Sequence, residues 1–297
     1  LLKLSLVCSL VGRTEAIYAR SEEGQSPPAY CTVFHHMVKS AGSTIKNALK
    51  VASVNDRVPG PSACARHMGR DEDCTNGISS AAVITGFAEL IREPLELAGR
   101  RDCEYFTMMR DPIDRLVSAF FYCPTDHDLQ NRPAEWCGFT ESDVPATERL
   151  LDFAKNRWKS QGFRQMSYGL FCPPNALCEA SGTPGPFRSL DEPGSLELLQ
   201  QVRGIFSSYT AIGIVEYYDL SMQLFNARVK SPVQDWTTNK KAVNQGQTSG
   251  LRHEVLRWAR SSPEIHRVLE ADLLLYAYCV ALFKRQTEES LGTVWTE

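Results

Sequence analysis

Short apolar runs alternate with amphipathic segments along most of the chain after residue 30. Residues 30–37, 81–87 and 103–110 are rich in β-branched and aromatic side chains, which predicts three strands. Apolar positions three and four residues apart follow the first and third runs and predict helices, with stripes formed by Ile45, Ala48, Leu49 and Ala52 and by Ile113, Leu116, Val117 and Phe120. Strands that alternate with helices predict an α/β domain with a central, mainly parallel sheet flanked by helices.

The remainder of the chain continues this alternation. Residues 150–158 predict a helix, and residues 209–226 predict a strand that leads into another helix. Residues 263–286 predict a long amphipathic helix whose apolar stripe contains one acidic residue, Asp272. A carboxylate in such a stripe needs a buried partner or marks the edge of the buried face.

The first 29 residues are expected to lie outside the folded domain. Residues 20–29 are polar, contain a glycine and a proline pair, and are typical of a linker. The apolar run at residues 1–12 is too short to span a bilayer and resembles the remnant of a signal peptide or signal anchor. A strand or helix packed on the domain is the alternative. We therefore expect an N-terminal segment and linker at 1–29 and a single domain at 30–297.

Composition and charge restrict the classes of function. The chain has 297 residues, of which 43% are hydrophobic and 23% charged, as is ordinary for a soluble globular protein. Its formal net charge of −3 at pH 7 argues against a general nucleic-acid binder, which carries a basic surplus. An anionic ligand must therefore be bound by a local basic patch.

The ten cysteines indicate an oxidising compartment. No C-x-x-C spacing occurs, so zinc-ribbon and thioredoxin-type sites lack their pattern. Six cysteines lie in loop-like stretches as neighbours suited to disulfides, namely Cys64 and Cys74, Cys123 and Cys137, and Cys172 and Cys178. Cys31, Cys103 and Cys279 lie in apolar runs and are interpreted as free core thiols.

A loop of small residues joins the first strand to the first helix. It contains a lysine followed by small residues that carry hydroxyl groups or permit close backbone approach, Lys39, Ser40, Ala41, Gly42, Ser43 and Thr44. Unpaired N–H groups at the start of a helix and the positive end of its dipole favour bound phosphate. The order differs from the Walker A motif, in which the lysine follows the glycines. A plain structural turn is the alternative.

The third strand also leads directly into a helix. Arg110 ends the strand, Asp111 is a natural N-cap, and Pro112 occupies the first helical position, where its missing N–H costs nothing. Ser118 follows Arg110 by eight residues. A guanidinium fork and a hydroxyl suit a phosphate group. Alternatively, Arg110 pairs with a carboxylate and Ser118 is a small residue on a packed helix.

Together, "HMVKSAGST" and "RDPIDRLVSAFFY" resemble the two nucleotide-binding motifs of the sulfotransferases that use 3′-phosphoadenosine-5′-phosphosulfate, PAPS. The form H-x-x-K followed by small residues is more similar to the Golgi carbohydrate sulfotransferases than to the cytosolic ones. "IGIVEYYDLSMQLF" and "LEADLLLYAYCVALF" resemble downstream segments of that group. The resemblance implies a P-loop-like three-layer domain that transfers a sulfuryl group from PAPS, its co-substrate, to a carbohydrate hydroxyl by in-line displacement.

The resemblance also implies roles for individual residues. Residues 39–44 would cradle the 5′-phosphosulfate, with Lys39 neutralising or protonating the leaving oxygen, and Arg110 and Ser118 would hold the 3′-phosphate. Lys240 and Lys241 match a basic loop that closes over the nucleotide, although a solvated charge pair is the alternative. The reaction needs no metal, and no ligand cluster with recognisable spacing is present in the sequence.

The general base is the weakest part of the match. Several carbohydrate sulfotransferases place a His or Glu just beyond the second strand, where this chain has Phe87. Glu89 is the nearest suitable group, with a solvated helix residue as the alternative, and His67 is a second choice.

The resemblance further implies a glycan or glycoconjugate acceptor and a Golgi-lumenal type II membrane protein whose anchor lies at or before the start of this chain. The net charge leads us to expect no nucleic-acid partner. A non-catalytic relative that binds PAPS or glycans and a P-loop-type kinase are the competing hypotheses. The missing Walker A order counts against the kinase.

Overall fold

The computed structural model describes residues 31–37, 39–55, 62–64, 83–86, 103–122, 143–158, 195–230 and 250–295. Five strands form one sheet in the order β2-β3-β1-β4-β5, and each neighbouring pair is parallel. Their bounds are β1 Cys31–His35, β2 Ser62–Cys64, β3 Val83–Gly86, β4 Cys103–Met109 and β5 Ala211–Ile214. The predicted α/β class, with a parallel sheet flanked by helices, is confirmed.

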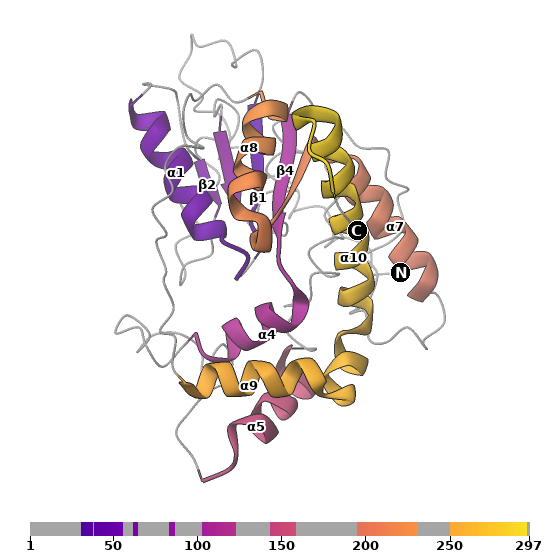
Figure 1. Cartoon of the computed structure of the whole chain (residues 1–297). Helices are drawn as coiled ribbons and strands as arrows, with labels where there is room; N and C mark the ends of the chain where they lie inside the picture. The colour runs from indigo at the N-terminus through magenta and orange to yellow at the C-terminus, as the bar shows by residue number, and fades with distance from the viewer. Residues whose placement is uncertain are drawn as a thin grey trace, which may run out of the picture.

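Helices surround the sheet and extend beyond the carboxyl ends of its strands (Figure 1). Helix α8 lies in front of the sheet in this view, and α10 runs beside the β5 edge, where it contacts β5, α7 and α8. The helices are α1 Gly42–Asn55, α4 Pro112–Phe120, α5 Ala146–Asp152, α7 Ser195–Ser207, α8 Tyr218–Arg228, α9 Gly250–Ser261 and α10 Pro263–Leu291, with a π-helical segment η4 at Phe153–Trp158 and a 3-10 turn η5 at Val215–Tyr217.

The central strands are buried on both faces, and most of their side chains are apolar. All residues of β1 are buried, as are all of β4 except the half-buried Glu104. Strands covered by helices on both sides carry continuous apolar runs and no alternation, which explains why the sequence pattern located them well. The Thr107 hydroxyl in β4 donates to the His35 carbonyl oxygen at 2.8 Å, so β1 and β4 are also joined where β1 ends.

Two apolar clusters form the core. One contains buried apolar side chains of the sheet together with those of α1, α7, α8 and the second half of α10. The other is built from α4, α5, η4, α9 and the start of α10, with Leu116, Phe120, Leu150, Val255 and Leu269 at its centre. The second cluster fixes α4 and α9 side by side beyond the carboxyl ends of the strands (Figure 1).

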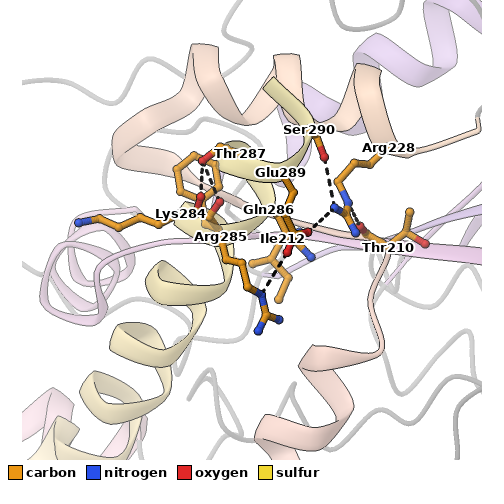
Figure 2. A network of polar contacts seen from close by, with 10 residues as sticks. Thr210, Ile212, Arg228, Lys284, Arg285, Gln286, Thr287, Glu289 and Ser290 are labelled. Atoms are coloured by element: carbon orange, nitrogen blue, oxygen red, sulfur yellow. Dashed lines mark hydrogen bonds and ion pairs between the residues drawn. The ribbon is translucent and has the colours of Figure 1, made fainter. Parts of the chain in front are cut away.

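The end of α10 is attached to β5 and α8 by polar contacts (Figure 2). Gln286 Oε1 accepts a hydrogen bond from the Ile212 amide at 3.0 Å. Arg228 donates to the Thr210 carbonyl oxygen at 2.8 Å and to the Ser290 hydroxyl at 3.2 Å. The outer edge of β5 is therefore partly satisfied by a helix in place of another strand.

The interpretation of Cys31 and Cys103 as free thiols is wrong. The β1–β4 register places them directly opposite each other, with 4.4 Å between their Cα atoms, and they form a disulfide. Cys279 is buried and free, as predicted. Cys64 lies in β2, whereas Cys74, Cys123, Cys137, Cys172 and Cys178 lie outside the described residues, so the three predicted loop disulfides stay predictions.

The structure also bears on the acidic residue in the long helix and on elements that the sequence did not predict. Asp272 is buried on α10, so it lies in the interior and not at the edge of the apolar stripe. A buried basic residue, Arg115, lies on α4, and α4 contacts α10. The structure adds β2, α7 and α9, which the sequence patterns did not predict. No helix in the described part of the chain is both long and apolar enough to cross a bilayer. The N-terminal segment and linker at 1–29 lie outside the described residues.

Candidate functional site

The candidate site lies where the connections of the sheet diverge. Strand β1 is central: the chain continues from it to β2 and β3 on one side, and from its other neighbour β4 to β5 on the far side. In open parallel sheets, ligands bind outside the carboxyl ends of the strands at such a switch point. The loops that leave β1 and β4 at this point are the two segments whose composition suggested phosphate binding.

The loop after β1 turns sharply into α1. Lys39 and Ala41 have φ angles of 64° and 57°, in the left-handed region that residues other than glycine rarely occupy. The Ser40 amide donates to the Met37 carbonyl oxygen at 3.2 Å, and the Thr44 amide donates to the Ala41 carbonyl oxygen at 3.0 Å. This geometry brings the first turn of α1 to the carboxyl end of β1, where amides of that turn lack intrahelical acceptors.

Gly42 is required by close packing. A methyl group at this position would overlap the imidazole ring of His36, which is 8% exposed and stacks with Phe34. The backbone of the small-residue loop is thus pressed against a buried ring. His36 therefore has a packing role.

The two loops are joined directly. Arg110 Nη1 donates a hydrogen bond to the Lys39 carbonyl oxygen at 3.2 Å, although the residues are 71 positions apart. The Lys39 ammonium group lies over the Tyr122 ring, 3.4 Å from its centroid. Tyr122 follows α4, the helix that begins just after Arg110. The cationic residues Lys39 and Arg110 are therefore in contact at the switch point.

The start of α4 is held by a short chain of hydrogen bonds. Asp111 caps the helix, accepting from the amides of Ile113 at 2.9 Å and Asp114 at 3.0 Å, and Pro112 follows it as predicted. The Asp111 amide donates to one oxygen of Glu216 at 3.1 Å, and the Tyr276 hydroxyl donates to the other at 2.8 Å. Burial and the neighbouring Glu216 carboxylate raise the pKa of Tyr276, so its hydroxyl stays protonated as a donor.

Two serines have distinct environments. The Ser40 hydroxyl is fully buried, and it has no hydrogen-bond partner among the described residues. A buried hydroxyl without a partner costs free energy, which a hydrogen bond to a bound group would recover. Ser118 is half-buried on α4, one helical turn after Asp114.

The structure describes most of the predicted site residues and brings several of them together. Lys39, Ser40, Ala41, Gly42, Ser43 and Thr44 form one turn, and Arg110 contacts it. Ser118 lies on the helix that Arg110 introduces. Glu89, Lys240 and Lys241 lie outside the described residues, as do Phe87 and His67.

Two further residues were not found from the sequence. Tyr122 comes four residues after Ser118, so a helical spacing argument could have placed the two side by side. Arg252 is half-buried near the start of α9, and its pKa is lowered by burial and by the nearby charge of Arg110. No pattern in the sequence connects Arg252 with Arg110, because their proximity depends on how α9 packs against α4.

Among the described residues, no three His, Cys, Asp or Glu side chains are grouped so that they could hold a metal ion. Comparison of the chain with models of protein families and with curated proteins finds no match.

Proposed function

We propose that the chain is a PAPS-dependent carbohydrate O-sulfotransferase with a P-loop-like three-layer domain. The observation that supports this most is the hydrogen bond between Arg110 and the backbone of Lys39 at the carboxyl ends of two adjacent parallel strands. Lys39 would bind the reacting phosphosulfate, and Arg110 would bind a second phosphate on the same nucleotide. PAPS carries both groups, whereas ATP lacks a 3′-phosphate.

In the proposed reaction, an acceptor hydroxyl oxygen forms a bond to sulfur while the bond between sulfur and the bridging phosphate oxygen breaks. The electron pair stays on the departing phosphate, and the acceptor's proton passes to a general base. Because the protein forms no covalent bond to the sulfuryl group in this scheme, positioning and charge stabilisation supply most of the catalysis. The Lys39 ammonium neutralises or protonates the leaving oxygen.

The 5′-phosphate would bind at the start of α1. The amides of Gly42 and Ser43 belong to the first helical turn, and the dipole of α1 adds positive potential at that end. The close contact between Gly42 and the His36 ring supports this role, because it keeps the backbone free of a side chain there. Arg110 and Ser118 would hold the 3′-phosphate, and Lys240 and Lys241 would close over the nucleotide.

Glu89 is the proposed general base, and the acceptor is a glycan or glycoconjugate. The Cys31–Cys103 disulfide supports an oxidising compartment, which agrees with the proposed location in the Golgi lumen. The proposed topology there is that of a type II membrane protein.

Calorimetry with 3′-phosphoadenosine-5′-phosphate and with ATP tests the donor. We expect micromolar binding of the 3′-phosphorylated nucleotide to the wild-type chain, weaker binding of ATP, and loss of binding in Arg110→Ala. Arg257→Ala, which removes an exposed guanidinium on α9, is the matched control and should bind like wild type. A preference for ATP, or no binding of either nucleotide, would exclude the sulfotransferase.

Transfer of labelled sulfate from PAPS to glycan acceptors then separates an enzyme from a binding protein. Lys39→Ala should lower the affinity for 3′-phosphoadenosine-5′-phosphate several-fold, because one cation is lost, and should lower transfer at saturating PAPS far more, because the lysine acts on the bond that breaks. Wild-type chain that binds the nucleotide and transfers sulfate to no acceptor would instead indicate the non-catalytic relative.

A further inference from the structure

Lys39 is held both at its backbone and at the end of its side chain. Its carbonyl oxygen accepts a hydrogen bond from Arg110 at 3.2 Å, and its Nζ lies 3.4 Å from the centroid of the Tyr122 ring. Both Lys39 and Tyr122 are half-buried. A lysine side chain has four rotatable bonds, and most of this freedom is lost when the ammonium group is seated on a ring.

The position of the ring is itself fixed by α4. The Tyr122 amide donates to the Ala119 carbonyl oxygen at 3.1 Å, which continues the turn at the end of the helix. The other end of α4 is capped by Asp111, directly after Arg110. One short helix therefore places a guanidinium against the Lys39 backbone and an aromatic face against the Lys39 ammonium.

An aromatic face attracts the charged form of an amine and not the neutral form, because the ring quadrupole is negative over its face. The ring therefore favours the ammonium state of Lys39. In sulfuryl transfer the lysine must be an ammonium when the bond between sulfur and the bridging oxygen breaks, since only that form can neutralise the departing phosphate or give it a proton.

We propose that Tyr122 is the positioning residue for Lys39, whose ammonium group its ring keeps charged and in place beside the leaving oxygen. This role rests on the proposed sulfotransferase function. The aromatic face is the part of Tyr122 that acts, so its hydroxyl is dispensable for this purpose.

The first experiment measures the lysine itself and needs no activity. The rate of reductive methylation of Lys39 is followed against pH by peptide mass spectrometry in wild type, Tyr122→Leu and Tyr122→Phe. Lys155, exposed on η4, is the internal reference. We expect Lys39 of Tyr122→Leu to react several-fold faster at a given pH, with its titration moved to lower pH, and Tyr122→Phe to match wild type. Equal reactivity of Lys39 in all three proteins overturns the inference.

The second experiment measures transfer from PAPS. We expect Tyr122→Leu to lower kcat about 10-fold, with the KM for PAPS changed less than about twofold, and to move the alkaline limb of the pH profile to lower pH. Tyr122→Phe should have the kcat and the alkaline limb of wild type. If Tyr122 has only a packing role, Tyr122→Leu should lower the melting temperature and leave the alkaline limb of the pH profile where it is in wild type.

The two proposals fail in different ways. If wild type transfers sulfate and Tyr122→Leu transfers it with the same kcat and pH profile, the role of Tyr122 is wrong and the sulfotransferase stands. If wild-type chain neither binds 3′-phosphoadenosine-5′-phosphate nor transfers sulfate, the function is wrong and the role of Tyr122 falls with it.

Discussion

The imidazole ring of His36 occupies the space that a side chain at Gly42 would need. Gly42→Ala should therefore destabilise the folded chain by about 1–3 kcal/mol, as is typical when a methyl group is forced into a packed interior. The free energy of unfolding from urea titration measures this cost. Calorimetry should show weaker nucleotide binding, because the first turn of α1 must move.

The double variant Gly42→Ala/His36→Ala is the matched control for this contact. Removing the ring opens the space for the methyl group, so Gly42→Ala should cost much less in the His36→Ala background than in wild type. An equal cost in both backgrounds would show that the ring is not what excludes a side chain at Gly42.

Arg252 places a second guanidinium near Arg110. Burial and the like charge of Arg110 oppose the Arg252 charge more than the nearby Asp114 carboxylate favours it, so we expect Arg252→Met to leave the free energy of unfolding unchanged or raised when no ligand is present. Nucleotide affinity should fall several-fold, because an anion at the site then meets one cation fewer. Arg257→Met on the exposed face of α9 should change neither quantity. A clear loss of stability in Arg252→Met would indicate a structural ion pair.

Burial lowers the pKa of His35 to about 3. The ring is enclosed in the core, with its Nδ1 2.8 Å from the Tyr209 hydroxyl. Below about pH 6.5 the unfolded chain binds a proton at His35 that the folded chain does not, so stability falls as pH falls. The free energy of unfolding falls by about 1.4 kcal/mol for each pH unit between the unfolded and the folded pKa of His35. Above the unfolded pKa nothing of this stability is lost.

Urea unfolding at several pH values between 7.5 and 4.5 checks this dependence. His35→Gln keeps a side chain that can bond to Tyr209 and removes the titration, so its stability should fall less steeply with acid than that of wild type. His253→Gln, on the exposed surface of α9, should retain the wild-type slope. Identical slopes for wild type and His35→Gln would contradict the assignment.

Gln286 satisfies a backbone amide of the edge strand β5. Gln286→Leu removes the acceptor for the Ile212 amide and should cost about 1–3 kcal/mol of unfolding free energy, the penalty of a buried unpaired donor. Arg285→Ala breaks only an exposed pair with Glu289 at 3.8 Å and should change stability by less than about 0.5 kcal/mol.

The sequence located elements whose causes are local. The buried strand β4 and its continuation into α4 were predicted because a continuous apolar run is followed by Asp111 and Pro112, a cap and a first-turn proline. The stripe of α1 was predicted for the same kind of reason, and Ile45, Ala48 and Leu49 are buried. The short strand β2 was not predicted, because a run of three residues is too short to show a periodic pattern.

The contacts that complete the site depend on pairing across the chain. Cys31 and Cys103 looked like separate core thiols because only the β1–β4 register places them opposite each other. Tyr122 meets Lys39, and Arg252 approaches Arg110, only after α4 and α9 have packed beyond the strands. Residue types in the sequence predicted the two loops of the candidate site, and the sheet order decides which other side chains lie beside these loops.

The central place of β1 also has a consequence for synthesis. β1 is the first strand of the described sheet to be made, yet its partner β4 pairs with it only 72 residues later, as the Cys31–Cys103 separation shows. Such non-local pairing is slow because the intervening loop must close first. A nascent chain that ends before β4 would contain the whole Lys39–Thr44 turn without Arg110, the capped helix or the ring of Tyr122. The candidate site would then be completed only after β4 has paired with β1 in the middle of the sheet.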